Sequence, residues 1–139
     1  IRDYPCPIIV IDMGTATTMS VVDPAGNYIG GTILPGLRIS LDTLSSKTAQ
    51  LPSISLDIPK KVIGKNTIDC MRSGIMYGNA GMIDGLIDRI EEELGQPASL
   101  VATGGLSRFI MPLCRHQIQY DEALMLKGLL ILFEKNKNL

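Results

Sequence analysis

A carboxylate, a glycine and three hydroxyl side chains follow one another early in this sequence. The segment Asp12-Met13-Gly14-Thr15-Ala16-Thr17-Thr18 comes directly after the apolar run Ile8-Ile9-Val10-Ile11. A strand that ends in a carboxylate and then turns at a glycine presents backbone N–H groups and hydroxyls, which a chain of phosphates requires as donors. Asp12 can then organise a cation or a water molecule while Gly14 and Thr15 approach the phosphates. The alternative is a plain β-turn in which Asp12 only caps a strand end.

A second segment repeats this logic further along the chain. Thr103-Gly104-Gly105 follows the apolar run Leu100-Val101-Ala102 and precedes a predicted helix. Glycines at such a turn let a flat ligand approach the backbone, and a helix N-terminus favours negative charge. Many strand-to-helix turns contain Gly-Gly without binding anything, so this segment alone is a weak signal. Neither segment is a P-loop, because the chain has no Gly-x-x-x-x-Gly-Lys-Ser/Thr.

Four glycines, Gly74, Gly78, Gly81 and Gly85, recur at helical spacing within one apolar stretch. Each interior helical glycine costs about 0.5–1 kcal/mol relative to alanine. The stripe therefore predicts a partner backbone packed very close, either inside the molecule or in another subunit.

Two other residues are ambiguous from sequence. Thr67, at the start of the same predicted helix, is either its N-cap or a hydroxyl donor to a ligand. His116 is the only histidine in the chain. We expect His116 to be a solvated residue near a helix end, without a catalytic role.

The secondary structure that must position these residues is of the α/β class. Three short apolar runs joined by tight turns predict an antiparallel meander, and the later elements complete a mixed sheet flanked by helices. Residues 48–65 are expected to be an irregular connection with at most a short strand. The expected strands are 8–12, 18–23, 28–34, 99–103 and 117–120, and the expected helices are 37–46, 67–94, 106–114 and 122–134.

Composition limits the class of protein. The 139 residues are 45% hydrophobic and 19% charged, which is typical of one globular domain. A net charge of −1 gives no support for a nucleic-acid partner. The longest candidate membrane stretch, Ala123–Phe133, contains Lys127 and is too short to span a bilayer, so no membrane partner is expected. Three widely spaced cysteines and no signal peptide favour reduced thiols in a cytoplasmic protein.

Taken together and in order, the motifs closely resemble those of type III pantothenate kinase, also called the Bvg accessory factor family. The resemblance extends over essentially the whole chain. It rests on Asp12–Thr18, Gly30-Gly31-x-Ile33-x-Pro35-Gly36-Leu37, Leu51-Pro52, Ile63-Gly64-x-Asn66-Thr67 with Ser73-Gly74, and Thr103-Gly104-Gly105.

The resemblance implies a fold, ligands and site residues. The family belongs to the acetate/sugar kinase, Hsc70 and actin superfamily, in which two ribonuclease H-like halves hold ATP between them. It implies ATP, Mg²⁺, a monovalent cation (K⁺ or NH₄⁺) and pantothenate as ligands, and a homodimer. Asp12 would correspond to the cation ligand and Thr67 to the pantothenate contact. The nucleotide-binding positions would be Gly14, Thr15, Thr103, Gly104 and Gly105.

The chain also departs from the family pattern. The family's Asp-x-Gly-Asn-Thr phosphate motif is absent, and so is its Gly-x-Asp-Arg segment, whose Asp is the general base. Asp3 follows an arginine rather than preceding one, so it does not substitute for that base. We therefore expect residues 1–139 to be a single C-terminal ribonuclease H-like domain, with the N-terminal half absent, and assign no catalytic residue to it. By itself such a fragment is expected to be inactive.

Two hypotheses compete with a kinase. A non-catalytic, nucleotide-binding regulatory protein fits a chain without the base. A ribonuclease H-like nuclease would need a cluster of acidic metal ligands, and the sequence gives Asp12 no convincing partners. We expect phosphorylation of pantothenate with ATP, the first step toward coenzyme A, to be the function of the protein to which this chain belongs.

Overall fold

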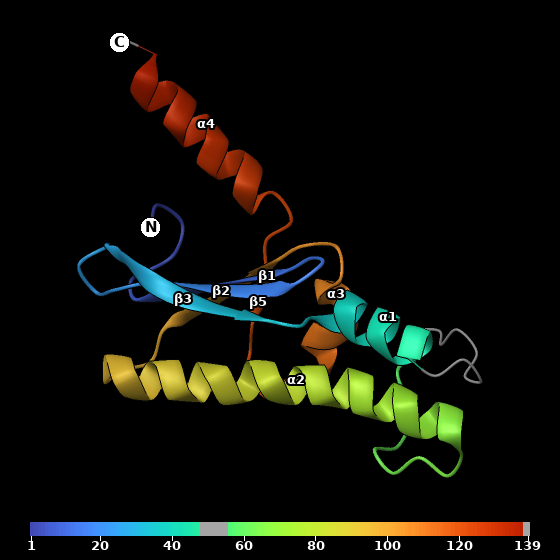
Figure 1. The fold of residues 1–139 in the computed structure, drawn as a ribbon. Coiled ribbons are helices and arrows are strands. Elements are labelled where there is room, and N and C mark those ends of the chain that lie inside the picture. The colour runs from blue at the N-terminus through green and yellow to red at the C-terminus, as the bar shows by residue number, and fades with distance from the viewer. Residues whose placement is uncertain (48–55, 138–139) are drawn as a thin grey trace.

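The computed structural model describes residues 1–47 and 56–137, which form a five-stranded sheet with helices (Figure 1). The strands lie in the order β3-β2-β1-β4-β5. β1 pairs antiparallel with β2, and β2 with β3, whereas β4 runs parallel to both β1 and β5. The predicted meander and mixed sheet are confirmed. The strand bounds are β1 Ile8–Met13, β2 Thr17–Val22, β3 Tyr28–Leu34, β4 Ser99–Thr103 and β5 Gln119–Tyr120.

One long helix covers one face of the sheet. α2 (Thr67–Leu94) runs along the sheet in Figure 1, and α1 (Leu37–Lys47) lies beside its N-terminal half. Burying apolar area against this helix is the main stabilising contribution of such a layer. The core between the layers is formed by Ile9, Ile11, Met13, Met19, Leu37, Leu41, Ile75, Met76, Ala80, Ile83, Ile87, Ala102 and Ile110.

The ends of α2 follow from its sequence. The Asn66 side chain accepts the Asp69 N–H at 2.9 Å, so Asn66 is the N-cap. Gly95 ends the helix at φ 73°, a left-handed conformation that favours glycine. The predicted bounds are therefore confirmed. Met82 lies outside the buried face of α2 and is 37% exposed.

The segment 106–114 was expected to be one helix, and this is wrong. It divides into α3 (Ser107–Ile110) and a 3₁₀ turn, η1 (Met111–Leu113). Pro112 has no N–H to continue α3, so the chain tightens into the 3₁₀ turn there. Of the expected connection 48–65, residues 48–55 and the Leu51-Pro52 motif lie outside the described residues, and residues 56–65 form no helix or strand.

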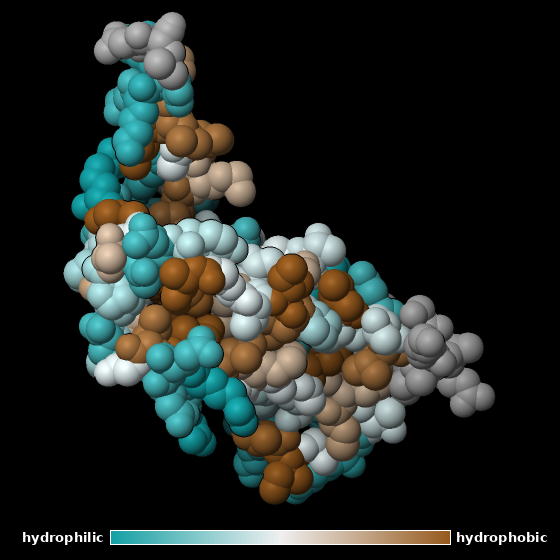
Figure 2. Space-filling model, turned by 60° about the vertical axis from the view of Figure 1, so that its left-hand side comes forward, coloured by the Kyte–Doolittle hydropathy of each residue, from teal (hydrophilic) through white to brown (hydrophobic). Residues whose placement is uncertain are grey.

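The last helix projects from the sheet. α4 (Leu124–Asn136) stands on the side opposite α2, and Figure 2 shows its apolar side chains at the surface. Met125, Leu126 and Phe133 are each more than half exposed. At its base, the Lys127 ammonium lies 2.8 Å from the Asp121 carboxylate, which also accepts a hydrogen bond from the Tyr4 hydroxyl at 2.7 Å. None of the helices described is both long and apolar enough to cross a membrane.

Candidate functional site

The sheet brings the two glycine turns together. Because β1 and β4 are parallel, their carboxyl ends lie at the same edge, and Asp12 is the register partner of Thr103. Ligands of open α/β sheets bind at such carboxyl edges. Two segments that are about ninety residues apart in sequence are therefore neighbours at one sheet edge.

Gly104 packs directly against the end of β1. Its φ is +99°, and a Cβ built there would lie 2.6 Å from the Met13 carbonyl oxygen and 2.8 Å from Asp12 Oδ1. The Leu106 N–H also donates to the Met13 carbonyl at 3.3 Å. Only glycine fits this conformation and this approach. Gly105, by contrast, has open space where a Cβ would stand.

The β1–β2 connection is a three-residue turn. Met13 pairs with Thr17, and the Gly14 N–H donates to the Ala16 carbonyl at 3.2 Å. Thr15 is exposed at the tip of the turn, whereas Thr17 is buried. A Cβ on Gly36 would lie 2.6 Å from Thr17 Oγ1, so the Thr17 hydroxyl faces the chain rather than solvent. Of the first two hydroxyls of the motif, Thr15 is the one available to a ligand.

The Asp12 carboxylate is half-buried and forms no hydrogen bond or ion pair with another described residue. Its oxygens are therefore available to an external cation, and hard carboxylate oxygens suit K⁺ or Mg²⁺. After Thr103, the Ser107 hydroxyl donates to the Thr103 carbonyl at 2.7 Å and begins α3. α3 has only four residues, so the dipole expected of a longer helix at this turn is small.

Thr67 lies apart from these turns. It is exposed in the first turn of α2, at the end that extends past α1 in Figure 1, whereas the carboxyl ends of β1 and β4 lie near α3. The N-cap of α2 is Asn66, so the Thr67 side chain does not cap the start of the helix. Its hydroxyl is free for another purpose, but the described chain does not bring it to the Asp12 turn.

The glycine stripe has no partner within the described part of the chain. A Cβ built on Gly74, Gly78, Gly81 or Gly85 meets no atom within 4 Å. The four glycines lie on the face of α2 opposite its buried residues Met76, Ala80, Ile83 and Ile87. An apolar groove of about 560 Å³ runs beside the stripe, lined among others by Met71, Met82 and Leu44. Of the two predicted kinds of packing partner, the internal one is not found among the described residues.

Sequence reasoning missed one cluster. Asp88, Glu91 and His116 place one potential metal-ligating atom each within 4.8 Å of the others. His116 Nε2 lies 2.6 Å from Asp88 Oδ1, and the imidazole is only 26% exposed, so the expectation of a freely solvated histidine is wrong. The signal was present in the spacing of Asp84, Asp88 and Glu91, which repeats every three or four residues on one helical face. Among the residues described, this is the one such group of three, and Asp12 is not in it.

Known proteins resemble this chain closely. A family model described as type III pantothenate kinase matches residues 1–89. The type III pantothenate kinase of Rhodospirillum rubrum is 48% identical over 134 residues, covering 96% of this chain and 52% of that protein. That of Moorella thermoacetica is 45% identical, with the same coverage of both chains. The chain thus spans about half the length of the curated relatives it matches.

A solved structure adds a likeness in fold. A Campylobacter jejuni protein described as belonging to the Baf family superposes with a TM-score of 0.69 at 24% identity, covering 96% of this chain and 60% of that one. At that identity the likeness concerns the fold alone. The sequence matches are close enough to assign the family. The Asp12 turn lies within residues 1–89 that the family model matches, and the Thr103 turn lies beyond them. The chain belongs to the type III pantothenate kinase family.

Proposed function

We propose that the protein containing this chain phosphorylates pantothenate with ATP, giving 4′-phosphopantothenate in the first step of coenzyme A synthesis. Family membership supports the reaction. The observation that links the proposed reaction to particular residues is the close approach of Gly104 to Asp12 at the shared edge of β1 and β4. It puts an unpaired carboxylate, an exposed hydroxyl and two glycine turns around one point, which is what positioning a phosphate chain requires.

We further propose a role for each residue of this edge. Gly14 and Thr15 would contact the phosphates, because Gly14 is partly exposed and Thr15 is exposed in the turn between β1 and β2. Thr103, Gly104 and Gly105 would hold the adenosine, since the open space beside Gly105 admits a flat group. The Asp12 carboxylate would hold K⁺ or NH₄⁺, which supplies positive charge beside the phosphates, and Mg²⁺ is expected with the nucleotide.

The fold assignment is proposed on the same grounds. The sheet order β3-β2-β1-β4-β5, with an antiparallel meander continued by parallel strands, fits one ribonuclease H-like half of a superfamily kinase. In this proposal the chain is the C-terminal half, and the first phosphate motif and the general base belong to the other half. The base would deprotonate the pantothenate hydroxyl, which attacks the γ-phosphate.

A homodimer is proposed from the outer face of α2. Four glycines there have no neighbour in the described chain, and two backbones can approach closely only across such a surface. An apolar groove borders the stripe, and an exposed apolar surface favours association. Exposed Thr67 lies on the same helix, so we propose that it contacts pantothenate near the boundary between subunits.

The test is pantothenate-dependent release of ADP from ATP by the full-length protein that contains this chain, with K⁺ and Mg²⁺ present. Turnover supports the proposal. Binding of ATP by calorimetry without any pantothenate-dependent turnover would contradict it, and would indicate a nucleotide-binding protein without kinase activity.

A further inference from the structure

The cluster of Asp88, Glu91 and His116 has a composition and scaffold that the proposed kinase site does not use. Asp88 and Glu91 are three residues apart on α2 and project from the same side of the helix. His116 approaches from the segment between η1 and β5, so the three groups come from two separate parts of the chain. A groove of about 570 Å³, lined in part by Asp84, Asp88, Arg115 and His116, opens beside them.

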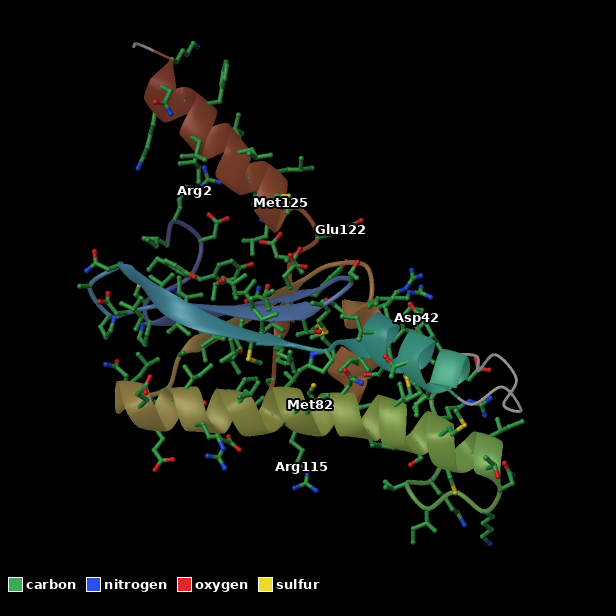
Figure 3. All side chains as sticks on the ribbon, viewed as in Figure 1. Arg2, Asp42, Met82, Arg115, Glu122 and Met125 are labelled. Carbon is green, nitrogen blue, oxygen red and sulfur yellow. The ribbon has the colours of Figure 1, made fainter. Side chains whose placement is uncertain are left out.

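Neighbouring contacts hold the imidazole in place. The Asp84 carboxylate accepts the N–H of Arg115 at 2.7 Å and the N–H of His116 at 3.1 Å. This double contact fixes the backbone of His116 to α2 independently of its side chain. In Figure 3 the Arg115 side chain extends past α2 and away from the sheet, so its positive charge points outward. Asp84 thus positions the His116 imidazole beside Asp88, although Asp84 is not itself one of the three ligands.

The second carboxylate ligand is also positioned. Glu91 Oε2 accepts the N–H of Ala98 at 2.8 Å, which leaves Oε1 available. A bond of this kind orients a metal-ligating carboxylate. A hydrogen bond of 2.6 Å joins Asp88 Oδ1 and His116 Nε2. An ion between them would replace the proton of this hydrogen bond and lengthen the separation to about 3.4 Å, the spacing of two ligand atoms about 2.1 Å from one tetrahedral ion.

We propose that Asp88, Glu91 and His116 form a binding site for a divalent transition metal ion, with Zn²⁺ as its probe, that fastens residues 114–116 to the C-terminal half of α2. One imidazole and two carboxylates favour a first-row transition ion over Mg²⁺ or K⁺, which prefer oxygen ligands alone. The three protein ligands leave a fourth position for water. Three carboxylates, those of Asp84, Asp88 and Glu91, provide the negative charge that attracts a cation.

Cysteine is the competing ligand that the test must exclude. Cys70 is exposed and lies at the other end of α2. Cys114 is closer to the cluster and is partly buried, but its sulfur is not among the ligand atoms that lie within 4.8 Å of one another.

The experiment is a calorimetric Zn²⁺ titration of the purified protein at pH 7.5, repeated with Mg²⁺. We expect one Zn²⁺ site and no Mg²⁺ binding at these residues. Affinity should fall by more than about tenfold in His116→Gln and in Asp88→Asn. Glu92→Gln removes an equal charge from the neighbouring exposed position, and Cys70→Ser removes the accessible thiol, so both should bind Zn²⁺ as the wild type does. Binding unchanged in His116→Gln, or lost in Cys70→Ser, would overturn the proposal.

A second measurement needs no variant and uses a sample of the 139-residue chain itself. His116 is its only histidine, so its imidazole gives one set of ring signals in a nitrogen–proton spectrum. Stoichiometric Zn²⁺ should shift these signals, and lowering the pH should reverse the shift because protons compete for the imidazole. Ring signals that do not move on adding Zn²⁺ would refute the site even if the variants failed to fold. Neither readout depends on kinase activity, so failure of this site leaves the proposed function unaffected.

Discussion

At the scale of single residues, the candidate site depends on how closely Gly104 approaches β1. Sequence reasoning identified Asp12, Gly14 and the Thr103 turn from local patterns, and the structure brings both turns to one edge. Sequence reasoning could not distinguish the Thr15 hydroxyl from the Thr17 hydroxyl. Thr17 is buried against Gly36 while Thr15 is exposed, and this difference depends on a segment nineteen residues further along the chain than Thr17.

Gly104→Ala should destabilise the protein by about 1–3 kcal/mol, because a Cβ at φ +99° is strained and meets the Met13 carbonyl and Asp12 Oδ1. Gly105→Ala is the matched control, since a Cβ there meets open space. It should change the free energy of unfolding by less than about 0.5 kcal/mol. Urea unfolding of both variants measures the difference. Equal effects of the two substitutions would show that the contact of Gly104 with β1 is unimportant.

His116 shows why part of the molecule could not be predicted. The spacing of Asp84, Asp88 and Glu91 is visible in the sequence, but their partner lies about 25 residues away beyond β4 and η1. Only packing of the 114–116 segment on α2 brings the imidazole to them. A pattern confined to one helix does not specify such a contact.

At the scale of elements, local signals predicted most of the secondary structure. α2 has a strong N-cap, a C-terminal glycine and a regular apolar face, so both ends were predictable. The division of 106–114 was not, because Pro112 ends a helix that apolar spacing alone would continue. The exposure of the apolar side chains of α4 was also not predicted, because the α4 sequence resembles that of a buried helix.

The start of α2 separates a structural residue from a candidate ligand contact. Asn66→Ala removes the cap and should lower the free energy of unfolding by about 0.5–2 kcal/mol. Thr67→Ala should leave stability within about 0.5 kcal/mol, because Thr67 is exposed and is not the cap, while raising KM for pantothenate in the full-length protein. Thermal unfolding and steady-state kinetics test the two effects. A Thr67 variant with unchanged KM would remove this residue from the proposed substrate site.

The base of α4 should respond to acid. Hydrogen bonds from Lys127 and Tyr4 hold the pKa of Asp121 below its ordinary value. Because the folded pKa is lowered, the stabilisation is present at neutral pH and is lost as pH falls through the folded pKa, below about 3.9. Asp121→Asn should therefore be less stable than wild type at pH 7 and no less stable near pH 2. A stability difference that stays constant across this range would contradict the assignment.

At the scale of the whole molecule, α2 has a buried face and an opposite face of glycines without neighbours in the described chain. Interior helical glycines are unfavourable, so their recurrence at one face calls for a compensating contact. The sequence predicted a closely packed partner, either internal or in another subunit. Because the described residues supply no internal partner, we propose another subunit.

Gly78→Glu should convert the proposed dimer to a monomer, and Gly78→Ala should weaken it while stabilising the isolated helix by about 0.5–1 kcal/mol. Gly128→Ala makes the same change in another helix with open surroundings, and should leave the dimer intact. Sedimentation velocity measures the association state. A wild-type monomer, or a dimer unaffected by both Gly78 substitutions, would contradict the proposed interface.

The central claim is that the Asp12 turn belongs to the phosphate and cation site of a pantothenate kinase. The most direct measurement is the initial rate of pantothenate-dependent ADP release by the full-length protein as K⁺ is increased, for wild type, Asp12→Asn and Asp42→Asn. Asp42 is an exposed carboxylate on α1 and serves as the matched control (Figure 3). We predict activation by K⁺ in wild type and in Asp42→Asn, and at least about tenfold weaker apparent K⁺ affinity in Asp12→Asn with unchanged thermal stability. An Asp12→Asn protein with wild-type rates and wild-type K⁺ dependence would contradict the account.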